Sequence, residues 1–315
     1  LEYGTMQTSS PQESVASSNK VLPFRWVIYA MCSYQIFIQW FILYAPTGLE
    51  NQFIDDYSLT YADYALLFSI ATGPTSIFPL FLGLVVDKLG VVFCAISSIS
   101  ILLIGNLIFV CAMYSSHPLL LMYVARCICG IGICYYGVTN NAILHVYFHN
   151  AELAFSLGIG PIHSRTGLAA GEFLSYAIYQ WLLNSLGSSQ MALIYVMWVT
   201  VILCTLSLLF ETSVLLSKRA YIAEHKRFIA AHEERKNMST LSEQDKSIYI
   251  KAKEYTLSFW IVIVIAGLGY LPFLGWMVTG TDALMTVYGF TQSTANYYLL
   301  IPNLSALIGC FVVGA

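Results

Sequence analysis

The sequence predicts an all-α polytopic membrane protein, and two observations carry this prediction. Of the 315 residues, 58% are hydrophobic and only 10% are charged, against roughly 25% charged in an average soluble domain. The apolar residues also come in long blocks, such as 24–44, 91–114 and 192–210. Blocks of this length reach the roughly 20 residues that a helix needs to cross a bilayer. A membrane β-barrel would instead show segments of about 10 residues with alternating polarity, which is not the pattern here.

Turn residues and charges divide the chain into eight expected membrane helices: 24–49, 61–86, 91–114, 118–146, 151–183, 190–212, 256–280 and 292–315. One connection is long, because residues 213–255 are polar throughout and carry nine of the 14 Lys and Arg residues. This layout predicts a first bundle of six helices over 24–212, a linker over 213–255, and the first two helices of a second bundle over 256–315. Residues 1–23 are expected to be a disordered tail without a cleavable signal peptide.

The distribution of charge predicts the orientation of the helices. The positive-inside rule places the Lys- and Arg-rich linker in the cytoplasm, and Lys20, Arg25 and Lys88 fall on the same side. The opposite side is acidic between the first two helices, at Glu50, Asp55, Asp56 and Asp63. We therefore expect a cytoplasmic N-terminus. Membrane lipids are expected partners, whereas the net charge of −3 argues against a nucleic acid, because phosphate binding needs clustered cations.

The chain carries no recognisable signature of an enzyme or a cofactor site. It lacks a phosphate-binding loop, a G-x-S-x-G nucleophile motif and any metal-ligand spacing of His, Cys, Asp and Glu. Its eight cysteines lie inside apolar blocks, so we expect them to be buried hydrophobic residues and not a disulfide framework. The sequence therefore predicts no enzymatic activity, no cofactor and no metal.

Two motifs lie at the ends of predicted helices. Residues 83–90 read G-x-x-x-D-[RK]-x-G, and residues 126–132 read R-x-x-x-G-x-G. In the first motif, we expect Gly83 to let a neighbouring helix approach, Asp87 to pair with a cation or a helix N-terminus, and Gly90 to make the turn. Both patterns resemble signature motifs of the major facilitator superfamily.

This resemblance implies the major facilitator fold, two six-helix bundles that move a solute by alternating access. On this interpretation the sequence ends in helix eight, and four further helices lie outside it. The resemblance assigns gating roles to Gly83, Asp87, Lys88, Gly90 and Arg126. For Arg126, in the outer half of the fourth helix, a structural role is the favoured alternative.

Shorter motifs resemble one branch of the superfamily, the carriers called major facilitator superfamily domain-containing protein one. These motifs are residues 44–49, 163–167, 271–275 and 288–290. The branch includes lysosomal dipeptide carriers. The resemblance therefore implies dipeptides or similar amino-acid-like solutes, and a lysosomal or other endomembrane location, with the plasma membrane as the alternative.

Polar residues at membrane depth are the candidates for solute binding, because they are costly to bury there without a role. Arg165 and Glu172 are seven residues apart in the fifth helix, on one face and roughly 10 Å apart along the axis, and Tyr176 extends that face. Arg165 is expected near the bilayer midplane, where facilitators place substrate. The alternative is that it stabilises the bundle by pairing with Glu172 or a backbone carbonyl. Weaker candidates, for which hydrogen bonding between helices is the alternative, are Tyr44, Gln39, Tyr135, Asn140 and Tyr270.

These observations predict a secondary transporter of a small organic solute. Uniport is preferred over proton coupling, because Glu172 is taken as the one carboxylate away from the helix rims. A carrier of monovalent organic anions is an alternative, since one Arg would suffice. A scaffold or receptor without transport, which would tolerate loss of Arg165, is another. The short outer loops also suggest a glycosylated accessory subunit, if the protein works in a protease-rich lumen.

Overall fold

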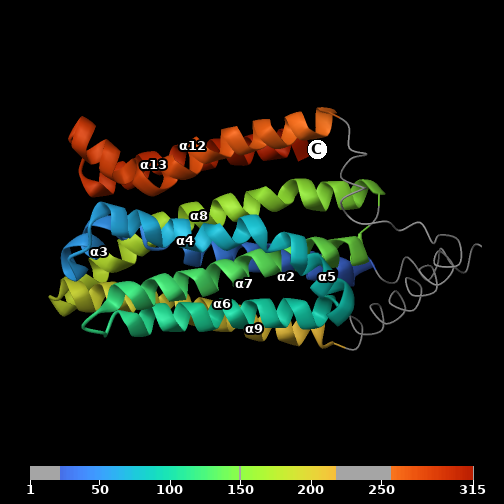
Figure 1. Cartoon of the computed structure of the whole chain (residues 1–315), viewed down its shortest axis with the longest axis horizontal. Coiled ribbons are helices and arrows are strands. Elements are labelled where there is room, and N and C mark those ends of the chain that lie inside the picture. Colours follow the sequence, from blue (N-terminus) through green and yellow to red (C-terminus); the bar gives the residue numbers. More distant parts are fainter. Residues whose placement is uncertain (1–21, 149, 218–256, 315) are drawn as a thin grey trace, which may run out of the picture.

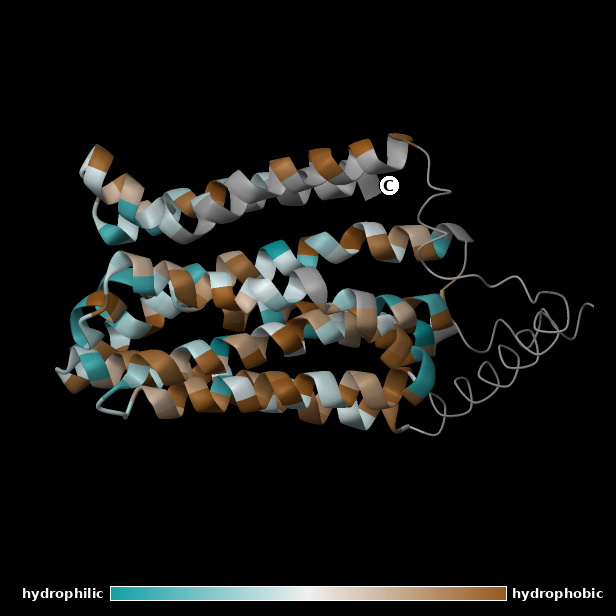
Figure 2. Ribbon diagram, viewed as in Figure 1, coloured by the Kyte–Doolittle hydropathy of each residue, from teal (hydrophilic) through white to brown (hydrophobic). Residues whose placement is uncertain are grey.

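The computed structural model describes residues 22–148, 150–217 and 257–314, and this part of the chain is helical and contains no strand. The long helices run side by side along the length of the molecule (Figure 1). Hydrophobic residues cover most of their length, and hydrophilic turns gather at the two ends with a few near the middle (Figure 2). The distribution fits helices that cross a bilayer with their ends in water.

Each of the eight expected spans contains a helix. The first six are α2 (Leu22–Tyr44), α4 (Tyr61–Ile77) with α5 (Pro79–Leu89), α6 (Val91–Ala112), α7 (Pro118–Tyr147), α8 (Asn150–Leu186) and α9 (Ser189–Leu215). The last two are α12 (Leu257–Tyr288) and α13 (Gln292–Gly314). A short 3-10 turn, η1 (Thr47–Leu49), and helix α3 (Glu50–Tyr57) connect α2 to α4. Most of the expected linker lies outside the described residues.

The structure differs from the expected helix boundaries at three places. The first helix ends at Tyr44 and not at 49, because Pro46 disfavours continued helix. The second helix is interrupted before Pro79, the first residue of α5, which lacks the amide hydrogen that a continuous helix needs. The seventh extends to Tyr288 and not to 280, and stops where Gly289 adopts a φ of 69°.

Four candidate spans in the described chain are both long and apolar enough to cross a membrane. They are Phe24–Tyr57, Val91–Ala112, Pro118–Tyr147 and Ser189–Leu215. Five of the described cysteines are buried as expected, but Cys111 is exposed, because it lies on the outward face of α6. That expectation therefore fails at Cys111.

The first bundle is held together by small residues that let helices approach closely. A Cβ atom at Gly132 of α7 would lie 2.8 Å from the backbone nitrogen of Leu102 in α6. A Cβ atom at Gly171 of α8 would lie 2.7 Å from the carbonyl oxygen of Phe41 in α2. Glycine at these positions allows backbone contact that any side chain would block, as is common between membrane helices.

Helices α12 and α13 lie on one side of the first bundle, above α8 in Figure 1. Helix α13 packs along α8, whereas α12 contacts the bundle at η1 and α4. The turn η1 leads directly into α3, which carries Glu50, Asp55 and Asp56, and Asp63 is in the first turn of α4. These contacts of α12 are therefore at the end expected to face away from the cytoplasm. We refer to it as the outer end.

Candidate functional site

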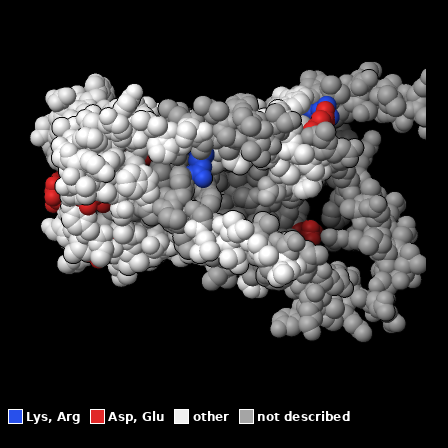
Figure 3. Space-filling view, turned by 90° about the horizontal axis from the view of Figure 1, so that it is seen from above, with Lys and Arg blue, Asp and Glu red and all other residues white. Residues whose placement is uncertain are grey.

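Arg165 lies near the middle of α8, the helix that faces both α2 and α13. Its side chain is partly exposed. Figure 3 shows a Lys or Arg side chain about midway along one face of the molecule, away from the acidic residues at the left end. Because the helix rises about 1.5 Å per residue, Arg165 stands roughly 20 Å from the start of α8. Arg165 is therefore near the middle of its helix, and its depth in the bilayer stays a prediction.

Glu172 lies on the same side of α8 as Arg165 but in a different environment. Its side chain is 0% exposed, and neither carboxylate oxygen has a hydrogen-bond partner among the described residues. The backbone of η1 covers this turn of α8, because a Cβ atom at Gly48 would overlap the Glu172 carbonyl oxygen. Tyr176, one turn further, is partly buried and packs on the apolar core of the first bundle.

The other predicted solute-binding residues lie at several depths. Gln39 and Asn140 are buried, and the Gln39 amide nitrogen and the Asn140 amide oxygen have no described hydrogen-bond partner. Tyr135 is buried in α7, and the Ser97 hydroxyl donates to its hydroxyl oxygen at 3.4 Å. Tyr44 is buried against Trp40, with ring centroids 5.8 Å apart. Tyr270 lies in α12, and its side chain is outside the described residues.

The motif over residues 83–90 lies at the end of the molecule opposite α3. Gly90 makes the expected turn between α5 and α6, with a φ of 82° and an amide that donates to the Val86 carbonyl at 3.0 Å. Asp87 and Lys88 are exposed. The expected close approach at Gly83 is not found, because no described atom lies within 4 Å of a Cβ atom placed there.

Arg126 is buried inside the first bundle. Its guanidinium carbon lies 4.6 Å from the ring centroid of Phe109 and 5.5 Å from that of Phe68. One guanidinium nitrogen donates to the Leu43 carbonyl at 3.3 Å. This environment fits the structural alternative for Arg126, and its gating role stays a prediction.

Three features of the site were not expected from the sequence. The first is a set of side-chain hydrogen bonds at the outer end that joins the first bundle to α13. The side-chain amides of Gln292 and Asn296, both in α13, each donate to the Gly48 carbonyl at 3.2 Å. Gln52 of α3 and Gln292 also exchange hydrogen bonds of 2.8 and 3.0 Å. Thr281 of α12 donates to Asn296 at 3.0 Å. We call these five residues the outer latch.

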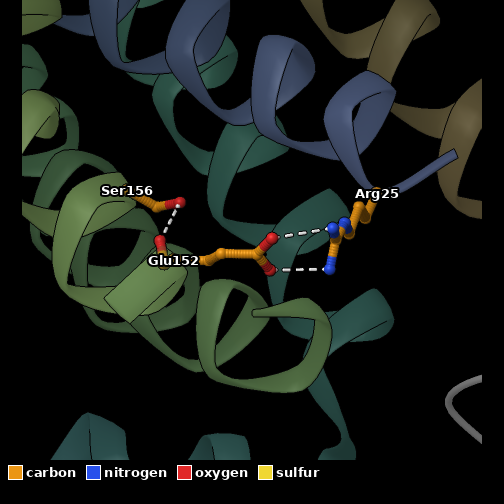
Figure 4. Close-up of polar contacts among 3 residues, drawn as sticks. All are labelled: Arg25, Glu152 and Ser156. Carbon is orange, nitrogen blue, oxygen red and sulfur yellow. Dashed lines mark hydrogen bonds and ion pairs between the residues drawn. The ribbon is translucent and has the colours of Figure 1, made fainter. Parts of the chain in front are cut away.

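The second feature is an ion pair at the other end of the bundle. Arg25 at the start of α2 donates to both carboxylate oxygens of Glu152 in α8, at 2.6 and 2.8 Å (Figure 4). The Arg25 guanidinium also lies 5.9 Å from the Phe148 ring centroid. Glu152 lies in the first turn of a helix, where acidic residues are common. Its spacing from Arg25 in the sequence does not predict that the two side chains form an ion pair.

The third feature is a second buried carboxyl group. Glu211 of α9 is 1% exposed, and neither of its carboxylate oxygens has a described hydrogen-bond partner. The groups beside it are the Tyr136 hydroxyl of α7 and the Cys32 thiol of α2. One turn earlier, Ser207 bonds to Gln35 of α2. Because Glu211 belongs to the helix rim, the interpretation that Glu172 is the one carboxylate away from the rims stays a prediction. Glu211 lies at the edge of an expected span, and the fold buries it because α2 and α7 cover that face.

The fold and these polar residues define a class of protein. It is a polytopic helical membrane protein with buried charged groups among its helices, and hydrogen bonds at the outer end join its first bundle to α13. A search of curated proteins finds no significant match to the chain. The family model described as Major Facilitator Superfamily matches residues 25–315. The chain belongs to the major facilitator superfamily and has its fold, and it is a secondary transporter of a solute.

Proposed function

We propose that the protein moves dipeptides or similar amino-acid-like solutes, and that Arg165 binds the solute carboxylate. The observation that carries this proposal is a partly exposed Arg near the middle of α8, a helix in contact with α2 on one side and α13 on the other. A guanidinium group at this depth is expensive unless it has a role. Its planar fork matches a carboxylate with two parallel hydrogen bonds, which a Lys ammonium group cannot do.

Glu172 is the proposed partner for the amino end of the solute. It stands two turns beyond Arg165 on the same face, roughly 10 Å along the axis. Each residue of an extended peptide spans about 3.5 Å, so the two ends of a dipeptide lie about 7 Å apart, and the long Arg side chain covers the difference. Glu172 is covered by η1 in this structure, so we propose that its carboxylate becomes accessible when the outer end opens.

The test compares Arg165→Lys with Arg165→Ala in proteoliposomes, with uptake normalised to folded protein. If Arg165 binds a carboxylate, both variants should lose most of the uptake of a radiolabelled dipeptide. Binding of the dipeptide and its C-terminal amide should be measured by thermal shift, because a ligand that binds the folded state raises the melting temperature. Full rescue by Lys, or equal binding of the amide, would refute the role. Organic acids tested alongside would reveal an anion carrier.

The transport mode and cellular setting are further parts of the proposal. Uniport stays a prediction, and uphill accumulation driven by a pH gradient would contradict it. We also propose a cytoplasmic N-terminus, a first bundle over 24–212 and a linker over 213–255. Single cysteines at positions 185 and 239 should then be labelled from opposite sides.

A lysosomal or other endomembrane location with a glycosylated accessory subunit is supported by the branch resemblance and by the short outer connections. Here α8 ends at Leu186 and α9 begins at Ser189. Co-purification of the tagged chain from lysosomal membranes tests both points. A chain that is long-lived alone in that lumen would count against the subunit.

A further inference from the structure

The outer latch closes the outer end with groups that do not change charge. Its donors are the side-chain amides of Gln52, Gln292 and Asn296, and its main acceptor is the Gly48 carbonyl. Amides and carbonyls carry no titratable proton in the physiological pH range. The latch therefore holds the two parts together but cannot respond to pH by itself.

Two carboxyl groups lie beside the latch, on opposite sides of the same contact. Glu50 is the first residue of α3, and Asp282 lies in α12 immediately after the latch residue Thr281. Burial is the larger cost to the charged form of Glu50, and the charge of Asp282 adds to it across the contact. Glu50 is 3% exposed, and its Oε2 atom has no described hydrogen-bond partner.

The charged and titratable groups around this pair come from several helices. Tyr64 lies beside Glu50, and its hydroxyl is also reached by Glu172 and by the buried cation Arg126. Tyr61 is reached by both members of the pair and, more weakly, by the exposed Asp55. Neither Glu50 nor Asp282 forms an ion pair within the described part of the chain. Two carboxylates in such a place repel each other, and burial adds the cost of desolvation, so a proton shared between them favours the contact.

We propose that Glu50 and Asp282 form a proton-binding pair that controls the outer gate. In the closed state shown here, one proton from the outer solution is bound to a carboxylate oxygen of the pair, so the charge of the pair changes from −2 to −1. When this proton leaves to water, two carboxylates lie on opposite sides of the contact and the latch opens. The inference rests on the alternating-access part of the proposed function and not on its substrate.

The experiment measures the outer gate directly. Spin labels at positions 185 and 293, both exposed at the outer end, are placed in a variant without the eight native cysteines, and the distance between them is measured in lipid nanodiscs. In the wild-type background the closed population should grow from about pH 8 to about pH 5, with a closed-to-open ratio that changes by at most about tenfold per pH unit, the limit for one proton.

The variants separate the pair from other acidic groups. Glu50→Gln should stay closed at every pH tested. Asp282→Asn, in a different helix, should favour the closed state and weaken the pH response, because the buried Glu50 can still lose its proton. Asp55→Asn, an exposed change in the same helix as Glu50, is the matched control and should keep the pH response. A wild-type distance that does not depend on pH would overturn the proposal, and so would a full response in both Glu50→Gln and Asp282→Asn.

The same samples distinguish this proposal from the proposed function. A protein that closes with falling pH but takes up none of the tested dipeptides would contradict the substrate assignment alone. A protein that transports dipeptides while its outer distance ignores pH would contradict the proton-binding pair alone.

Discussion

Gly48 is the point at which the outer latch can be tested by adding a single methyl group. In Gly48→Ala the new Cβ atom would overlap the backbone carbonyl oxygen of Glu172, lie 3.1 Å from its carbonyl carbon and come within 3.5 Å of the Asn296 side-chain nitrogen. The first two obstacles are backbone atoms, so rotation of a side chain cannot relieve them. Either η1 or α8 has to move.

The size of the effect follows from the kind of contact. Forcing an extra methyl group into a packed site costs about 1–3 kcal/mol, and here the shift also weakens the two amide hydrogen bonds to the Gly48 carbonyl. Near the melting temperature, 1 kcal/mol corresponds to roughly 2–4 °C for a domain of a few hundred residues. We therefore expect Gly48→Ala to lower the melting temperature by several degrees and to increase labelling of a cysteine at position 293.

The control is Gly137→Ala in α7, where no described atom lies within 4 Å of the added Cβ atom. Alanine is the better helix former, so this variant should be more stable by about 0.5–1 kcal/mol. Thermal unfolding of both purified variants in the same lipid provides the comparison. If Gly48→Ala melts like the wild type and labels no faster at the outer end, the close backbone contact between η1 and α8 is not what holds that end shut.

Three further predictions concern charged groups inside the bundle. Glu211→Gln should keep the wild-type melting temperature, because it removes no hydrogen bond. Glu211→Lys forces a cation into an apolar site and should destabilise the protein by about 3 kcal/mol or more. Equal melting temperatures of the two variants would contradict this prediction. Arg126→Lys keeps the charge but loses the planar contact with Phe109, so it should cost about 1–2 kcal/mol in thermal unfolding, and an unchanged melting temperature would argue against a structural role. The side chains of Arg25 and Glu152 are 19% and 44% exposed. A double-mutant cycle on them should give a coupling free energy of about 0.5–1 kcal/mol that falls with added salt. A coupling free energy of about 3 kcal/mol that does not depend on salt would contradict this, because it would show that the pair is effectively buried.

The family and the order of the helices could be predicted from local sequence. A block of apolar residues long enough to span a bilayer has few alternatives to a helix, because every backbone polar group in lipid must be satisfied within the segment. The turn at Gly90 was predictable for a similar reason, since its φ of 82° is readily adopted by glycine. The position of Arg165 near the middle of α8 followed from counting residues along one helix.

Contacts between distant segments could not be predicted in this way. Glu152 meets Arg25 across 127 positions of the chain, and Gln292 meets Gly48 across 244. Both contacts depend on which helix faces which, and hydrophobicity alone does not decide this for helices that are apolar on most sides. The expected close approach at Gly83 was wrong for the same reason. A glycine leaves room for a neighbouring helix, but whether a helix packs there depends on the tertiary fold.

The sequence by itself therefore determined the membrane helices, their order, the superfamily and the candidate Arg165, because each depends on composition or spacing within one segment. Only the tertiary structure decided that Glu172 and Glu211 are both enclosed, that Arg126 is held between aromatic rings, and that Glu50 is buried beside a latch of amides. The physical reason is that burial and charge pairing are properties of the space between helices, and that space is set by packing of residues far apart in the chain.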